Sequence, residues 1–184
     1  MHPHPCPTRP TTARGATLIE VLVAILLLSF GLLALGAMLG FATQAPRMSS
    51  YRATAANLAA AHIERVRANP TGFIAGSYAV ASSYDGTLNP IGLTSCTYPN
   101  CGPAELAALD NTTAQRAVRN DLPAGGLVLT CDGTCSLTNA ANLWILWLEP
   151  STFASLNPAN SDNCPAQAAQ FNPRPRCLYV RFKI

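Results

Sequence analysis

Residues 14–42 of this 184-residue chain read RGATLIEVLVAILLLSFGLLALGAMLGFA. From Val21 to Ala42 the chain has no charged residue and a single hydroxyl side chain, Ser29. With a rise of about 1.5 Å per residue, a helix of these 22 residues is long enough to cross a hydrocarbon layer of roughly 30 Å. A helix in a soluble core would carry polar residues at helical spacing, which this run lacks. The sequence therefore predicts a membrane-spanning helix.

Glu20 stands directly before the apolar run. A carboxylate at membrane depth is costly unless it has a partner or takes up a proton. One interpretation is that Glu20 only marks the boundary between membrane and water. Within the run, Gly36 and Gly40 form a small-xxx-small pattern that allows close helix approach, although such patterns are frequent by chance.

The first fifteen residues, MHPHPCPTRPTTARG, are polar and rich in proline, and they carry Arg9 and Arg14 without an acid. This composition is typical of a basic segment on the cytoplasmic side of a membrane. An ordinary secretory signal would instead be cut after the apolar run, and Ala34-Leu35-Gly36 is a candidate site for that cut. Both interpretations stay open on these grounds.

The junction from Arg14 to Ala24, RGATLIEVLVA, resembles the class III signal of type IV pilins and pseudopilins. The resemblance implies that a prepilin peptidase cuts after Gly15, the last leader residue, and methylates Ala16, the first residue of the mature chain. Glu20 then corresponds to the acid that the family carries at this distance from the cut. Major pilins usually begin with Phe, so the Ala start favours a minor subunit.

The resemblance also implies a mode of assembly. The mature chain would wait as a single-pass protein of the bacterial inner membrane, with a periplasmic C-terminal domain, before its apolar helix joins a central helix bundle at the cell surface. There Glu20 would pair with the N-terminal ammonium of a neighbouring subunit and set the axial register. The implied partners are the prepilin peptidase, the major pilin and other minor pilins, the inner-membrane assembly platform and, before assembly, membrane lipid.

A second helical segment follows the membrane segment. Pro46 is expected to kink or interrupt the helix, and residues 50–68 are rich in alanine and helix-forming. Asn69-Pro70 is a credible helix end. His62 has no second histidine nearby outside the leader, so it is not expected to bind a metal.

Residues 70–184 have the composition of a small extracytoplasmic domain with long loops. A helix is expected over 103–122, with Leu106, Leu109, Thr113 and Ala117 on its apolar side. Strands are expected over 73–80, 127–131, 143–149 and 177–184. Three or four antiparallel strands packed on the second half of the long helix give an α+β domain, which is the pilin fold that the resemblance implies. The expected organisation is a leader (1–15), a membrane and assembly helix (16–45) and an extracytoplasmic domain (46–184).

The order of motifs in this domain resembles the PilV-type minor pilins, also called type IV pilus modification proteins. The motifs are Asn120-Asp121-Leu122-Pro123, Gly125-Gly126, Trp144-Ile145-Leu146-Trp147 and Cys177-Leu178-Tyr179-Val180. The resemblance implies a minor pilin that helps to prime, assemble or modify a type IV pilus. The alternatives are a pseudopilin of type II secretion and a pilus-tip adhesin or DNA-uptake subunit.

Seven cysteines in a chain of this size indicate an oxidising compartment. Cys6 lies in the expected leader, and the six others allow fifteen pairings. Proximity in sequence favours Cys96–Cys101, Cys131–Cys135 and Cys164–Cys177. Zinc is the rival interpretation because two of these spacings approach those of zinc ligands. The missing histidines and the expected compartment favour disulfides.

The composition argues against several classes of function. With 11% charged residues and a formal net charge of +3, the chain is poorly suited to coat DNA. Arg174, Arg176, Tyr179 and Arg181 are thin support for phosphate contacts, so nucleic acid is not an expected partner. The acids are scattered, and no catalytic triad or phosphate-binding loop can be assembled. We therefore expect no enzymatic activity, no cofactor and no metal.

Overall fold

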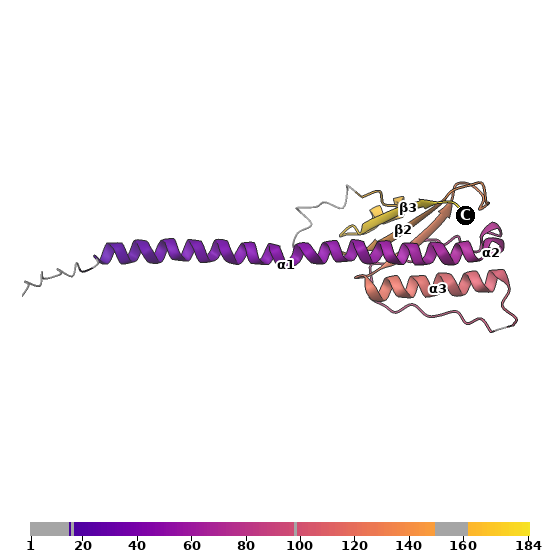
Figure 1. Ribbon diagram of the computed structural model, residues 1–184, viewed down its shortest axis with the longest axis horizontal. Helices are drawn as coiled ribbons and strands as arrows, with labels where there is room; N and C mark the ends of the chain where they lie inside the picture. The colour runs from indigo at the N-terminus through magenta and orange to yellow at the C-terminus, as the bar shows by residue number, and fades with distance from the viewer. Residues whose placement is uncertain (1–14, 16, 98, 150–161) are drawn as a thin grey trace, which may run out of the picture. The chain divides into compact units, whose positions relative to one another are not determined.

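The computed structural model describes residues 15, 17–97, 99–149 and 162–184. The fold is α+β: a long apolar N-terminal helix, further helices and a small antiparallel sheet (Figure 1). The chain divides into two compact units with the boundary between Ala45 and Pro46. The helix α1 (Leu18–Ala68) contributes residues to both units.

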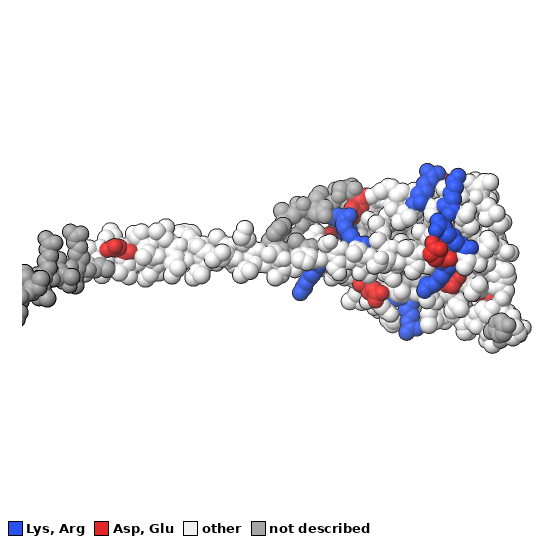
Figure 2. Space-filling view, viewed as in Figure 1, with Lys and Arg blue, Asp and Glu red and all other residues white. Residues whose placement is uncertain are grey.

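In the first unit, α1 is apolar on every side. All large apolar side chains from Leu18 to Leu39 are exposed, and Figure 2 shows this surface nearly free of charge except for one acidic side chain near its start. The hydroxyl of Ser29 donates to the carbonyl of Ile25 at 2.7 Å, so it adds no unpaired polar group. Within the described residues, Leu18–Gly40 is one helix segment of 23 residues that is long and apolar enough to cross a membrane.

Pro46 lies inside α1, so the expected interruption of the helix at this residue is wrong. Proline removes one backbone N–H donor, and the helix-forming residues 50–68 that follow keep the chain helical. The expected helix end is confirmed, because α1 stops at Ala68, directly before Asn69.

The second unit contains a sheet of three antiparallel strands in the order β1 (Gly126–Cys131), β2 (Ala141–Trp147) and β3 (Arg176–Phe182). The strands predicted at 127–131, 143–149 and 177–184 are confirmed, with ends shifted by one or two residues. The register places Trp144 of β2 between Val128 of β1 and Tyr179 of β3.

The strand expected over 73–80 is wrong. Residues Pro70–Ile74 form the short helix α2, and only Val80 makes an isolated bridge, to Leu129 of β1. The reason is local, because the side chain of Asn69 accepts a hydrogen bond from the N–H of Gly72 at 3.1 Å and proline occupies the first helical turn. Both features start a helix.

One face of the sheet forms the main core with α1 and α3 (Pro103–Asp121). Small residues on the helices, Ala55 and Ala59 of α1 and Ala107 and Ala114 of α3, are buried in this core. Figure 1 shows α3 beside the second half of α1. The buried side of α3 differs from the expected one, because Leu106 is 38% exposed while its neighbour Ala107 is fully buried.

The opposite face of the sheet carries a smaller core. Its buried members come from β1, β2, β3, the loop at Tyr84 and the short 3-10 helix η3 (Ala166–Gln170): Tyr84, Ala124, Val128, Leu146, Ala168 and Cys177. Phe171 packs edge-on against Tyr84, with ring centroids 4.8 Å apart. The sheet is therefore covered on both faces where η3 and the loop at Tyr84 pack against it.

Gly125 and Gly126 bring three segments of the chain close together. A Cβ atom on Gly125 would overlap the carbonyl oxygen of Val118 in α3, and one on Gly126 would lie 2.5 Å from the Cα of Tyr84. Glycine at these positions therefore permits the close approach of α3, β1 and the loop at Tyr84.

We predict that Gly125→Ala lowers the free energy of unfolding by about 1–3 kcal/mol, because the added methyl group must displace backbone atoms. Gly92→Ala is the matched control, since a Cβ there meets no atom within 4 Å, and its expected effect is below about 0.5 kcal/mol. Urea unfolding of the full chain in detergent micelles measures both values. Equal stability of the two variants would contradict the close approach.

Candidate functional site

The N-terminal segment presents Glu20 at the start of the apolar helix. Gly15 is exposed, and Ala16 lies outside the described residues. The carbonyl of Thr17 accepts the N–H groups of Glu20 at 3.0 Å and Val21 at 3.2 Å, which begins the hydrogen bonding of α1. Glu20 is exposed in the first turn of α1. A carboxylate there stabilises the helix, because the backbone N–H groups of the first turn have no acceptor within the helix and attract negative charge. The carboxylate is available to a partner.

The apolar helix also exposes backbone at its glycines. A Cβ on Gly31, Gly36 or Gly40 would meet no atom within 4 Å. Positions without a side chain allow another helix to approach closely. This segment can therefore present both a carboxylate and bare backbone to neighbouring helices.

A buried ion cluster lies at the start of β3. The Arg176 side chain is 2% exposed and binds Asp162 through Nε at 2.7 Å and Nη2 at 3.1 Å. Glu149 lies 3.6 Å from the same guanidinium. Asp162 also accepts the N–H of Cys177 at 3.1 Å and faces Arg52 of α1 at 3.3 Å. The cluster thus connects α1 to β3 and does not present Arg176 to solvent.

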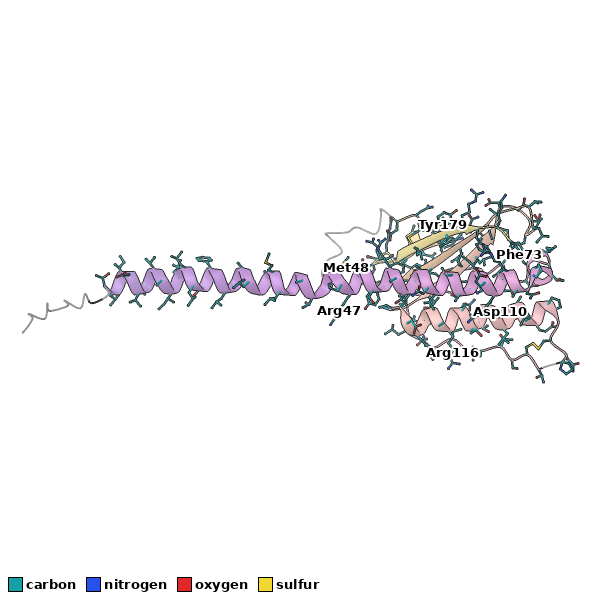
Figure 3. All side chains as sticks on the ribbon, in the orientation of Figure 1. Arg47, Met48, Phe73, Asp110, Arg116 and Tyr179 are labelled. Carbon is teal, nitrogen blue, oxygen red and sulfur yellow. A yellow bond between two sulfur atoms is a disulfide. The ribbon has the colours of Figure 1, made fainter. Side chains whose placement is uncertain are left out.

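The outward face of the sheet carries a row of hydrogen-bonded side chains. The hydroxyl of Tyr179 donates to Asn142 at 2.7 Å, and Asn142 in turn donates to Asp132 at 2.7 Å. Arg181 pairs with Asp132. The amide of Asn142 and the Arg181 guanidinium lower the pKa of the Asp132 carboxyl. The ring of Tyr179 stacks on Trp144, with ring centroids 5.1 Å apart. Figure 3 shows Tyr179 on the side of the sheet away from α1.

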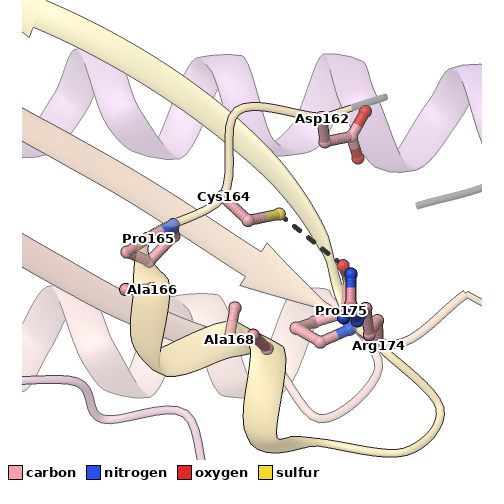
Figure 4. A pocket seen from close by; sticks show the side chains of 8 residues that line it. Asp162, Cys164, Pro165, Ala166, Ala168, Arg174 and Pro175 are labelled. Atoms are coloured by element: carbon pink, nitrogen blue, oxygen red, sulfur yellow. Dashed lines mark hydrogen bonds between the residues drawn. The ribbon is translucent and has the colours of Figure 1, made fainter. Parts of the chain in front are cut away.

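The four residues considered for phosphate contacts therefore do not make one open basic surface. Arg176 is buried in the ion cluster, Arg181 is paired with Asp132, and Tyr179 uses its hydroxyl and one ring face within the protein. Arg174 lines a pocket beside Cys164 and Pro175, which Asp162 of the ion cluster also lines (Figure 4). That pocket has a volume of about 150 Å³, well below the range of roughly 300–1,000 Å³ that is usual for small-molecule sites.

All six cysteines expected in the mature chain form disulfides. The bonds are Cys96–Cys101, Cys131–Cys135 and Cys164–Cys177, the pairs that sequence proximity favours. Their Cα atoms lie 5.2 to 5.6 Å apart, within the usual range for a disulfide. No group of three or more His, Cys, Asp or Glu residues that could hold a metal occurs among the described residues.

Arg119 is a buried arginine whose structural role the sequence analysis did not predict. Its side chain is 2% exposed and donates to the carbonyls of Ser83, Thr87, Asn89 and Gly125 at 2.7–3.0 Å, and it pairs with Asp85 at 3.0 Å. It holds the loop at 83–89 against the end of α3. Its partners are mostly backbone carbonyls, which leave no residue-type signal in the sequence.

Comparison of the chain with protein families, curated proteins and solved structures found no match. The assignment of function therefore depends on the residues of the N-terminal segment and of the folded unit.

We predict that Arg176→Met lowers the free energy of unfolding by about 3–5 kcal/mol, because it leaves the buried carboxylates of Asp162 and Glu149 without their main cation. Arg52→Met is the control: it removes a second cation near Asp162, but its side chain is 46% exposed, so a loss below about 1 kcal/mol is expected. Chemical unfolding in micelles compares the two. Similar losses would show that the cluster does not depend on Arg176.

Proposed function

We propose that this chain is a minor pilin of the PilV type, which takes part in priming, assembling or modifying a type IV pilus. The observation that carries the proposal is the spacing at the N-terminus: Gly15, then Glu20, then an apolar helix, all behind a short basic segment. Glu20 is an exposed carboxylate at the start of a helix that is otherwise apolar on every side. A plain membrane anchor does not require such a carboxylate, so we assign Glu20 a role in assembly.

Processing at Gly15 would keep the apolar helix in the mature protein. The subunit would then be held in the inner membrane as a single-pass protein, with residues 46–184 in the periplasm. On assembly, its helix would leave lipid and pack among the helices of other pilins. In that apolar bundle the Glu20 carboxylate needs a cation, and the N-terminal ammonium of a neighbouring subunit would supply it and set the axial position.

The folded unit is compatible with a pilin fold. The second half of α1 packs with a small antiparallel sheet, and three disulfides suit a domain outside the cytoplasm. The partners in this proposal are the prepilin peptidase, the major pilin, other minor pilins and the inner-membrane assembly platform.

A pseudopilin of type II secretion is the second candidate, because the same N-terminal pattern serves both systems. A strain that lacks the protein separates them. Loss of surface pili and twitching motility supports the pilus, and loss of protein secretion with normal pili supports the secretion system.

The mature protein is predicted to begin at Ala16 and to carry an N-methyl group. Intact-mass measurement and N-terminal sequencing of the protein purified from its native membrane test this. A start near Ala37 would instead indicate an ordinary secretory signal and would refute the pilin assignment.

Replacing Glu20 with Val is predicted to leave leader cleavage intact and to reduce incorporation into filaments at least about tenfold, because the ion pair that fixes the register is lost. Ser29→Ala is the control in the same helix, since the Ser29 hydroxyl bonds only to the carbonyl of Ile25. Immunoblots of sheared filaments and of membranes give the two fractions. Normal incorporation of the Glu20 variant would rule out this role.

A further inference from the structure

His62 lies at the centre of the buried face of α1. Its side chain is fully buried, and Ala59, Ile63 and Val66 around it are buried as well. At about 100° per residue, positions 55, 59, 62 and 66 fall on one narrow side of the helix. An imidazole in the middle of this face has no short route to solvent, unlike a residue at its margin.

The ring of His62 lies next to the place where α1, α3 and the segment after α2 meet. Tyr78 of that segment presents its ring edge-on to His62, with centroids 6.2 Å apart. The hydroxyl of Tyr78 donates to Asp110 of α3 at 2.6 Å and lies 3.4 Å from the carbonyl of Arg65 in α1. We call this meeting place, formed by His62, Arg65, Tyr78 and Asp110, the α1–α3 seam.

Neither ring nitrogen of His62 has a hydrogen-bond partner among the described residues. A neutral imidazole tolerates such a site at modest cost, but a charged one loses its hydration without compensation. A proton on the ring would thus place an unpaired charge in the core.

The charged and titratable groups around the ring do not favour an imidazolium. On α1 the nearby charge is Arg65, a cation. Tyr78 stays neutral because burial and its bond to Asp110 raise its pKa, and Asp110 of α3 is occupied by that hydroxyl. The strand residues of the same core are apolar, including Leu127, Ile145 and Phe182. Burial, and then Arg65, lower the pKa of His62 from 6.5 to about 4.

We propose that protonation of His62 releases the α1–α3 seam in acid. Uptake of one proton by its imidazole opens the packing of α1 against Tyr78 and α3. The inference needs only the fold of residues 46–184 and holds whether or not the chain is a pilin. Its consequence is that acid exposes a face of α1 that is buried at neutral pH.

The direction of the effect follows from proton linkage. Between pH 6.5 and 4 the unfolded chain binds a proton at His62 and the folded chain does not, so stability falls as pH falls through this window. From pH 7 to pH 5 the unfolding equilibrium constant is expected to rise by about 20-fold. Asp132, whose pKa is lowered below 3.8, loses its contribution only at lower pH, so it does not account for a change between pH 7 and pH 5.

The test compares the full chain with His62→Phe, which keeps an aromatic ring of similar size but cannot take up a proton. In detergent micelles, urea unfolding at pH 7 and pH 5 should show this rise of about 20-fold for the parent chain and almost none for the variant. Amide hydrogen exchange in α3, corrected for intrinsic rates, should accelerate at pH 5 only in the parent chain. Equal pH dependence of the two proteins would overturn the proposal.

Direct titration of the imidazole covers the case in which His62→Phe fails to fold. Selective isotope labelling of histidine and assignment of His62 in the parent chain would give its midpoint by nuclear magnetic resonance. A His62 that stays neutral down to about pH 5 and then titrates together with the loss of α3 protection supports the release. A ring that titrates near pH 6.5 while α3 stays protected would refute it.

Discussion

A helix that is apolar on every side is stable only where lipid or other helices cover it. This constraint applies to Leu18–Gly40, and it bears on the interpretation of the residues just before this helix. The proposed cut at Gly15 leaves the helix in the mature protein, and Glu20 becomes the one charged side chain in its first turn. The hydrophobic excess of the composition is therefore largely a property of this one segment and does not signify a large core.

The folded unit depends on further interactions, because long loops connect its helices and strands. Its loops are held by polar groups and covalent bonds. Arg119 binds the loop at 83–89, Arg176 and Asp162 connect β3 to α1, and three disulfides close short segments. Buried arginines of this kind are stable because nearly every donor has a carbonyl or carboxylate acceptor.

Local signals predicted much of this fold, and their failures have identifiable causes. The apolar run, α3, three strands and the short-range disulfides follow from periodicity and proximity. The segment 73–80 was misjudged because the Asn69 cap and Pro70 outweighed its apolar residues. The buried side of α3 was misjudged because alanine, which fits close to another helix, marks it better than leucine does. The contacts of Arg119 and Arg176 could not be predicted, since their partners depend on the tertiary fold.

Many charged side chains of the folded unit pair with one another. Removing Arg9 and Arg14 with the leader leaves ten basic and nine acidic residues, a net charge of +1. Among the described residues of the folded unit, five arginines have acidic partners, namely Arg52 and Arg176 with Asp162, Arg67 with Glu64, Arg119 with Asp85 and Arg181 with Asp132. A surface whose cations are neutralised internally gains little from phosphate contacts. Glu20 differs from these acids because no described residue of its own chain forms an ion pair with it. In the apolar bundle proposed above, its carboxylate would need a cation from outside the described residues or a proton.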